Sequence, residues 1–188
     1  MLIKRKFYNR NTIQVAKDLL GCFLVREYNG KIIKAMITET EAYRGEYDLA
    51  CHASKGRTKR TEIMYGEPGH AYVYMIYGMY YMLNVITEEK DFPAAVLIRC
   101  VRVFGHPMSK EDSARGTSDV LSGPGRLTKY LHIGKSLNGC DLTVGKKLWL
   151  EKSLGHSMSK WKVIKSPRVG IDYARHCKSW KWNFKLKK

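Results

Sequence analysis

The most strongly patterned stretch of the chain is residues 71–86, where uncharged β-branched and aromatic residues stand on both sides of Gly78. Two such runs around a glycine predict a β-hairpin, with Gly78 providing positive φ in the turn. Tyr77 then lies at the hairpin tip, where a large exposed aromatic side chain is costly unless a partner receives it. An ordinary core hairpin is the alternative interpretation.

The first 43 residues predict a short helix followed by a second hairpin. The pair Asn11-Thr12 is placed to cap a helix over residues 13–20. An Asn-Gly pair at positions 29–30, a strong hairpin signal, joins two extended runs over residues 22–28 and 31–43.

Alternation within residues 31–43 gives the second of these strands two distinct faces. One face carries Glu39, Glu41 and Tyr43, and the other carries Thr38, Thr40 and Ala42. Two carboxylates beside an aromatic ring on one sheet face are unusual, and the alternative is a solvated strand end.

The remaining pattern consists of short elements. Residues 94–103 form a nearly continuous apolar strand that contains Arg99, which needs a partner or access to water. Further predicted elements are a turn and short helix over 44–54, a helix over 126–133, and strands over 146–150 and 161–171. The aromatic end (Trp180, Trp182, Phe184) either docks as a last strand or frays.

These elements predict an α+β fold, with a curved, mostly antiparallel sheet, a protruding hairpin and a few short helices. No repeat or linker divides residues 1–188, which predicts a single domain. The basic ends, residues 1–6 and 185–188, are candidates for fraying.

Charge narrows the class of partner. Lysine and arginine outnumber aspartate and glutamate 34 to 17, for a net charge of +17. Such an excess favours a polyanionic partner, nucleic acid before a membrane. The loop over residues 55–61 contributes Arg57, Lys59 and Arg60 among hydroxyls and a glycine, a composition suited to phosphate contacts, although a solvated loop explains it as well.

Other classes of function lack support in the sequence. The five cysteines are far apart and form no C-x-x-C pair, and the histidines have no metal-ligand spacing, so we expect no disulfide framework, metal or cofactor. No signal peptide or membrane-spanning run is indicated. The widely spaced cysteines fit a reducing intracellular compartment.

Several motifs together resemble the alkyladenine (3-methyladenine) DNA glycosylase family. They are Thr40-Glu41-Ala42-Tyr43, Ala50-Cys51-His52, the run from Tyr72 to Tyr80, Asn84, Val96 to Arg99, Ser122-Gly123-Pro124 and Pro167 to Gly170. The matches keep their order and spacing from about residue 8 to residue 184. None of them is a common short motif, so the resemblance is specific.

The resemblance implies a monofunctional base-excision repair enzyme that acts as a monomer on double-stranded DNA. It implies an intracellular protein located with the DNA, in a bacterial cytoplasm and nucleoid or in a eukaryotic nucleus. The enzyme would flip an alkylated or deaminated purine nucleotide out of the duplex and hydrolyse its N-glycosidic bond. Glu41 matches the general base that activates water, and Arg99 matches an arginine near that water. Tyr77 matches the wedge that fills the space left by the base.

Four further residues match the family's base pocket. Tyr43 and His52 match the walls that sandwich the flipped base, and Tyr74 matches a residue that packs against it. Asn84 matches the residue that disfavours the exocyclic amine of guanine. Glu39 shares a face with Glu41, and only the motif selects Glu41 as the base.

The base pocket requires a particular loop length in the hairpin over residues 71–86. With a two-residue turn at 77–78, Tyr74 would pair with Tyr81 and point to the face opposite Asn84. If Tyr74 and Asn84 line one pocket, the hairpin loop must be odd in length or carry a bulge.

The chain departs from the family after Arg99. The family continues into Glu-Pro and an acidic helix, whereas here Cys100 to Gly105 follow and the polar segment up to Ser122 is short. DNA contacts from residues 100–122 are therefore not carried over.

Two other functions fit part of the pattern. A bifunctional glycosylase/lyase needs an amine nucleophile, and no lysine lies in a recognisable lyase motif. A non-catalytic nucleic-acid-binding module accounts for the charge and the tyrosines, but a carboxylate such as Glu41 in an anion-binding groove is unfavourable unless it does chemistry.

Overall fold

The computed structural model describes residues 1–104, 119–153 and 161–187, so most of the polar segment over 105–122 lies outside the described residues. Within these described residues the sheet has nine strands, with the order β3-β4-β5-β2-β1-β7, while β6 pairs with β5 and β9 pairs with β2 and β8. All of the described strand pairs are antiparallel. The predicted α+β class is confirmed.

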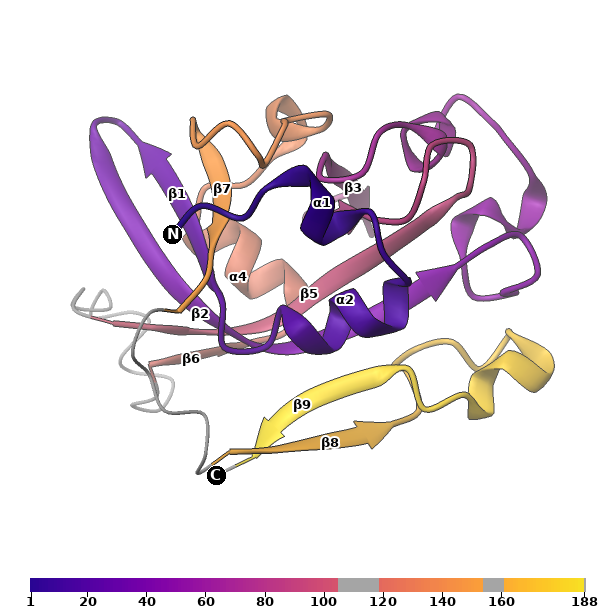
Figure 1. Cartoon of the computed structure of the whole chain (residues 1–188). Coiled ribbons are helices and arrows are strands. Elements are labelled where there is room, and N and C mark those ends of the chain that lie inside the picture. The colour runs from indigo at the N-terminus through magenta and orange to yellow at the C-terminus, as the bar shows by residue number, and fades with distance from the viewer. Residues whose placement is uncertain (105–118, 154–160, 188) are drawn as a thin grey trace.

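The strands are β1 (Phe23–Tyr28), β2 (Lys31–Arg44), β3 (Ala71–Ile76), β4 (Tyr80–Ile86), β5 (Ala94–Val103), β6 (Val120–Ser122), β7 (Leu148–Glu151), β8 (Lys162–Ser166) and β9 (Asn183–Lys187). The helices are α1 (Arg5–Tyr8), α2 (Thr12–Asp18) and α4 (Pro124–Tyr130), with short 3₁₀ turns η1 (His52–Lys55), η2 (Glu62–Tyr65), η3 (Lys135–Leu137) and η5 (Arg175–Ser179). Figure 1 shows α2 lying along one face of the sheet and the β8–β9 ribbon beside β2.

The N-terminal helix α2 is capped as predicted. The side chain of Asn11 accepts hydrogen bonds from the backbone N–H groups of Ile13 and Gln14. The helix covers residues 12–18 rather than 13–20, and the preceding turn α1 was not predicted. In the described parts of the chain, no helix is long and apolar enough to span a lipid bilayer.

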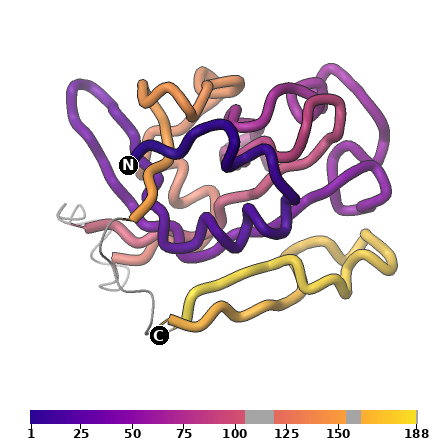
Figure 2. The backbone as a smooth tube through the Cα atoms, viewed as in Figure 1, coloured from indigo at the N-terminus to yellow at the C-terminus, as the bar shows by residue number. Residues whose placement is uncertain are grey.

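The first hairpin has the predicted two-residue turn. Tyr28 pairs with Lys31, and Asn29 and Gly30 between them have φ of 49° and 71°. Positive φ at both turn positions matches the right-handed twist of the flanking strands. The turn lies at one end of the molecule, and the loops between β2 and β3 gather at the other end (Figure 2).

Strand β2 carries a β-bulge around Glu39, where its register with β5 shifts twice. Ile37 before the bulge and Ala42 after it both belong to the main core, although they lie five positions apart and strict alternation would place them on opposite faces. Strict alternation would turn Glu39 and Glu41 toward the core together with Ile37. The bulge therefore places both carboxylates on the opposite face.

The hairpin β3–β4 has an odd loop, as the shared pocket required. Ile76 pairs with Tyr80, which leaves three residues, 77–79, in the loop. Tyr74 then lies opposite Met82, and Tyr72 lies opposite Asn84. Tyr74 and Asn84 are consequently on the same face of the hairpin, and the predicted irregularity is confirmed.

The C-terminal aromatic segment docks as a strand. β9 pairs with both β2 and β8, and Phe184 is buried in the main core. At the other end of the chain, Leu2 forms a bridge with Glu151. Fraying was therefore the wrong alternative for Leu2 and for residues 185–187, because backbone pairing holds both.

Several predicted boundaries were wrong: α4 ends at Tyr130 rather than at residue 133, and β7 covers residues 148–151 rather than 146–150. Two others have an evident cause. α4 starts at Pro124 rather than at residue 126, since proline is favoured in the first turn of a helix. β8 ends at Ser166, five residues before the predicted limit of 171, at the residue before Pro167.

Candidate active site

A cleft of about 550 Å³ opens beside the bulged part of β2. Its walls come from β2, the β3–β4 hairpin, β5, the start of α4 and the loop after β8. Tyr43, His52, Tyr74, Tyr77 and Arg99 all line it. The fold thus brings together five of the predicted site residues from four separate segments.

Glu41 lies fully buried beneath this cleft, and its carboxylate accepts four hydrogen bonds. Its Oε2 accepts from the Tyr43 hydroxyl at 2.9 Å and from Arg99 Nη1 at 3.3 Å. Its Oε1 accepts from the backbone N–H of Val169 at 2.8 Å and from Asn183 Nδ2 at 3.0 Å. Every partner donates, which is the arrangement that an ionised carboxylate requires.

Glu39 is the second carboxylate on this face. Its Oε1 accepts from Arg99 Nε at 3.1 Å and from Asn183 Nδ2 at 2.9 Å, and its Oε2 lies 3.4 Å from Lys185 Nζ. Burial alone would raise the pKa of Glu39. The hydrogen bond from Asn183 and the charges of Lys185 and Arg99 outweigh burial, so its pKa lies below the ordinary value.

The contacts distinguish the two carboxylates. Three partners of Glu41, namely Tyr43, Arg99 and Val169, line the cleft. Of the groups that contact Glu39, only Arg99 does. Glu41 is therefore the carboxylate more closely connected to the space that a substrate would occupy.

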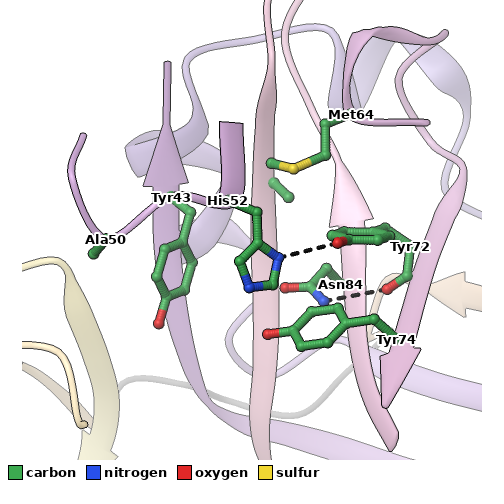
Figure 3. A pocket seen from close by; sticks show the side chains of 8 residues that line it. Tyr43, Ala50, His52, Met64, Tyr72, Tyr74 and Asn84 are labelled. Carbon is green, nitrogen blue, oxygen red and sulfur yellow. Dashed lines mark hydrogen bonds between the residues drawn. The ribbon is translucent and has the colours of Figure 1, made fainter. Parts of the chain in front are cut away.

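The inner end of the cleft is a small pocket of about 20 Å³, lined by Tyr43, His52, Tyr74 and Asn84 among others. In Figure 3, His52 lies between Tyr43 and the tyrosines of β3. The His52 and Tyr74 rings are 4.6 Å apart in an edge-to-face arrangement. The inner pocket has room for about one water molecule, so a planar base would occupy the wider cleft in front of it.

His52 is held as a neutral imidazole. Its Nδ1 lies 3.0 Å from the hydroxyl of Tyr72. Burial, followed by the positive charge of Arg60, lowers the pKa of His52 from 6.5 to about 4. At neutral pH the His52 ring therefore adds no positive charge to the pocket wall.

Asn84 is buried at the inner end of the pocket. Its Nδ2 donates to the backbone carbonyl of Tyr72 at 3.2 Å, and its amide oxygen points toward His52 (Figure 3). This hydrogen bond holds the amide in one orientation, so Asn84 is a rigid part of the wall.

Tyr77 projects from the hairpin tip and is 83% exposed. The same tip exposes three further large side chains, Met75, Met79 and Tyr80, which the sequence interpretation did not select. Tyr80 packs against Gly125 at the start of α4, where an added Cβ would lie 2.9 Å from the ring. The helix therefore supports the hairpin from behind and leaves its tip free.

The three basic residues of the 55–61 loop have different surroundings. Arg57 pairs with Glu62 and Asp91, so two carboxylates already compensate its charge. Arg60 lies over the ring of Tyr74, 5.1 Å from its centroid. Lys59 is exposed and has no ion-pair partner within the described residues. Phosphate contacts from this loop remain a prediction.

A buried ion pair behind the site was missed by the sequence interpretation. Arg168 and Asp48 are both fully buried, and the guanidinium donates to both carboxylate oxygens, at 2.5 and 2.8 Å. The guanidinium also lies over the ring of Tyr43, 4.7 Å from its centroid. Tyr43 and Val169 are two of the groups that hold Glu41. Arg168 contacts the first and directly precedes the second in the chain.

Asn183 was also missed, because it lies in a segment for which fraying was considered. Arg168 stands within the Pro-Arg-Val-Gly motif that contributed to the resemblance, but no local pattern indicates its partner Asp48. Among the described residues, no group of three or more histidine, cysteine, aspartate or glutamate side chains is arranged to hold a metal ion.

Replacing His52 by glutamine should make stability less sensitive to acid. Between pH 6.5 and pH 4 the unfolded chain binds a proton at His52 that the folded protein does not, so the native protein loses stability as pH falls through this window. Urea denaturation of wild type and variant at pH 7.5 and pH 4.5 measures this loss. An equal loss in both proteins would contradict the neutral imidazole.

Replacing Arg168 by methionine should lower the free energy of unfolding by about 3–5 kcal/mol, because Asp48 is left as a buried unpaired charge. Arg57→Met removes an exposed arginine with two carboxylate partners and is the matched control. The control should change stability little, since water screens exposed pairs. Denaturant titration of both variants checks the contrast, and similar losses would contradict it.

Comparison with known proteins agrees with the resemblance seen in the sequence. The family model described as methylpurine-DNA glycosylase (MPG) matches residues 6–188. A putative 3-methyladenine DNA glycosylase of Methanocella arvoryzae is 44% identical over 190 residues, covering 97% of this chain and 91% of the relative. One of Carboxydothermus hydrogenoformans is 47% identical over 174 residues, covering 92% and 90%.

A third relative with the same description, from Desulfitobacterium hafniense, is 44% identical over 193 residues, with 97% of this chain and 93% of the relative covered. Both the family model and the relatives span nearly the whole chain. The chain therefore belongs to the methylpurine-DNA glycosylase family and is a hydrolase that acts on N-glycosyl bonds in DNA.

Proposed function

We propose that this protein is a monofunctional glycosylase of base-excision repair that flips alkylated or deaminated purine nucleotides out of duplex DNA. It then hydrolyses the N-glycosidic bond with a water activated by Glu41. The observation that carries the proposal is the buried Glu41, held by three groups that line an aromatic cleft. The relatives named putative 3-methyladenine DNA glycosylases support the substrate class.

Glu41 supplies both parts of the chemistry. Cleavage of the N-glycosidic bond passes through an oxocarbenium-like sugar, and a carboxylate near C1′ stabilises that positive charge and takes a proton from water. Each Glu41 oxygen already accepts two hydrogen bonds. A water must replace one of these contacts, and the bond from Arg99 Nη1, at 3.3 Å, is the longest.

The aromatic walls suit the proposed substrate. Purines alkylated at N3 or N7 are cationic, and the faces of Tyr43 and Tyr74 favour a cation. The depressed pKa of His52 keeps that ring neutral beside the cation. Asn84 closes the inner end of the pocket and, in this proposal, leaves no space for the exocyclic amine of guanine.

The hairpin tip supplies the wedge. Extruding a nucleotide costs a few kcal/mol, and a side chain inserted into the gap offsets part of that cost. Tyr77 is exposed on a hairpin that α4 supports, which suits insertion into a duplex. The net charge of +17 suits the DNA backbone. Lys59 and Arg60 are the better candidates for phosphate contacts, since Arg57 is paired with Glu62 and Asp91.

The proposed enzyme works as a monomer, in the compartment that holds the DNA, and without a cofactor. A lyase activity would need an amine nucleophile in the cleft. The described residues that line the cleft include no lysine, and Lys185 is ion-paired with Glu39 instead. We therefore propose a glycosylase without lyase activity.

Replacing Glu41 by glutamine should lower the excision rate by at least about 100-fold, since general base catalysis contributes that much or more. The assay is release of hypoxanthine, 7-methylguanine, 3-methyladenine and ethenoadenine from duplex oligonucleotides, with DNA binding measured in parallel. The variant should still bind damaged DNA, because the cleft walls are unchanged.

Glu39→Gln is the matched control, because both glutamines place an amide among donors and incur a similar structural cost. The Glu39 variant should keep most of the excision rate. If the Glu39 variant lost its excision activity and the Glu41 variant kept it, Glu39 would be the general base. If wild type released none of the four bases, the proposed function would be wrong.

Replacing Tyr77 by serine should reduce the excision rate of a well-paired lesion by about 10-fold. This corresponds to about 1.4 kcal/mol by which the inserted Tyr77 side chain offsets the cost of base extrusion. The same lesion opposite a mismatched base, which extrudes more easily, should be affected less. Tyr28→Ser, on the remote β1–β2 hairpin, is the control and should behave as wild type. Equal losses on paired and mismatched substrates would count against a wedge.

A further inference from the structure

Asn183 occupies a position between the two carboxylates that no other neutral side chain shares among the described residues. Its Nδ2 donates to Glu39 Oε1 at 2.9 Å and to Glu41 Oε1 at 3.0 Å. A primary amide nitrogen has two hydrogens, so both donors are used. Asn183 is itself buried, so water does not compete for these bonds.

The amide orientation is set from the other side. The hydroxyl of Ser166 donates to Asn183 Oδ1 at 3.3 Å, which leaves the nitrogen facing the carboxylates. Ser166 pairs with Asn183 across β8–β9, and Asn183 pairs with Glu41 across β9–β2. Ser166, Asn183 and Glu41 are therefore in register on β8, β9 and β2. On its opposite face, β9 is anchored by buried Phe184.

Two adjacent carboxylates repel each other, and the pair is stable only if donors and cations compensate both. The charged groups that face the pair are Arg99 from β5 and Lys185 from β9, with the Tyr43 hydroxyl on Glu41. Arg99 also bridges the pair, through Glu39 Oε1 and Glu41 Oε2, whereas Asn183 joins the Oε1 atoms of both residues. Without Asn183, nothing described links these two Oε1 atoms.

We propose that Asn183, supplied by the C-terminal strand, is a positioning residue that holds Glu41 in its reactive orientation through its hydrogen bond to Glu41 Oε1, while its second donor compensates Glu39. This inference rests on the proposed function of Glu41. It extends the site to β9, near the end of the chain. Asn183 touches neither substrate nor water in this role, so it acts only through the carboxylates.

The test compares Asn183→Leu with Phe184→Leu. The first change keeps the number and branching of the side-chain heavy atoms but removes both donors, and the second weakens the packing of the same strand without touching a carboxylate. The single-turnover excision rate and the affinity for damaged duplex DNA are measured for both, with melting temperatures to match their stability. If Asn183→Leu does not fold, Asn183→Ala removes the same donors with a smaller side chain.

We expect Asn183→Leu to lower the excision rate by roughly 10- to 100-fold while affinity for DNA stays within about twofold, as for loss of other residues that orient a reactive group. Phe184→Leu should lose stability but keep its excision rate. A wild-type rate in the Asn183 variant, or equal loss in both variants, would overturn the inference alone. An inactive wild type, or an active Glu41→Gln, would instead overturn the proposed function.

Discussion

Two carboxylates buried side by side on one strand are the constraint on which this structure depends. Glu39 and Glu41 repel each other, and a buried charge without partners costs several kcal/mol. Arg99 compensates them from β5, and Asn183 from β9, 144 residues beyond Glu39. Strands on both sides of β2 must therefore be in place before this cluster is stable, which ties the site to the completed sheet.

The bulge in β2 reconciles this cluster with a hydrophobic core. Before the bulge, odd-numbered residues such as Ile37 face the core, and after it even-numbered residues such as Ala42 do. An unbroken strand would have turned both glutamates into the apolar interior. Local irregularity at this point is what allows one strand to contribute both to the core and to the cleft.

Electrostatics differ sharply between the surface and the cleft. The molecule carries a net charge of +17, which suits a polyanion, while the groups beneath the cleft are carboxylates held by donors. Between them stand the aromatic rings and a neutral His52, whose pKa is lowered to about 4 by burial and by Arg60. The arrangement suits an enzyme that attracts DNA by its surface and receives a cationic base in its interior.

The sequence by itself determined the elements whose signals are local. Alternation, the Asn11 cap and the Asn-Gly turn act over a few residues, so α2, the β1–β2 hairpin and the shared face of Glu39, Glu41 and Tyr43 were predictable, but the bulge in β2 was not. The family motifs added Glu41 and the pocket residues. Because they place Tyr74 and Asn84 in one pocket, they also predicted an odd number of residues in the hairpin loop or a bulge, and the loop has three residues.

Only the tertiary structure decided the contacts of Asp48, Arg168 and Asn183. Arg168 is 120 residues from Asp48, and Asn183 is 142 residues from Glu41. No periodic pattern can encode which distant segment docks beside β2, because that choice depends on burial and hydrogen bonding summed over the whole sheet. For Arg57 the fold decided the pairing with Glu62 and Asp91, 5 and 34 residues away, where the composition of the loop indicates only a basic surface.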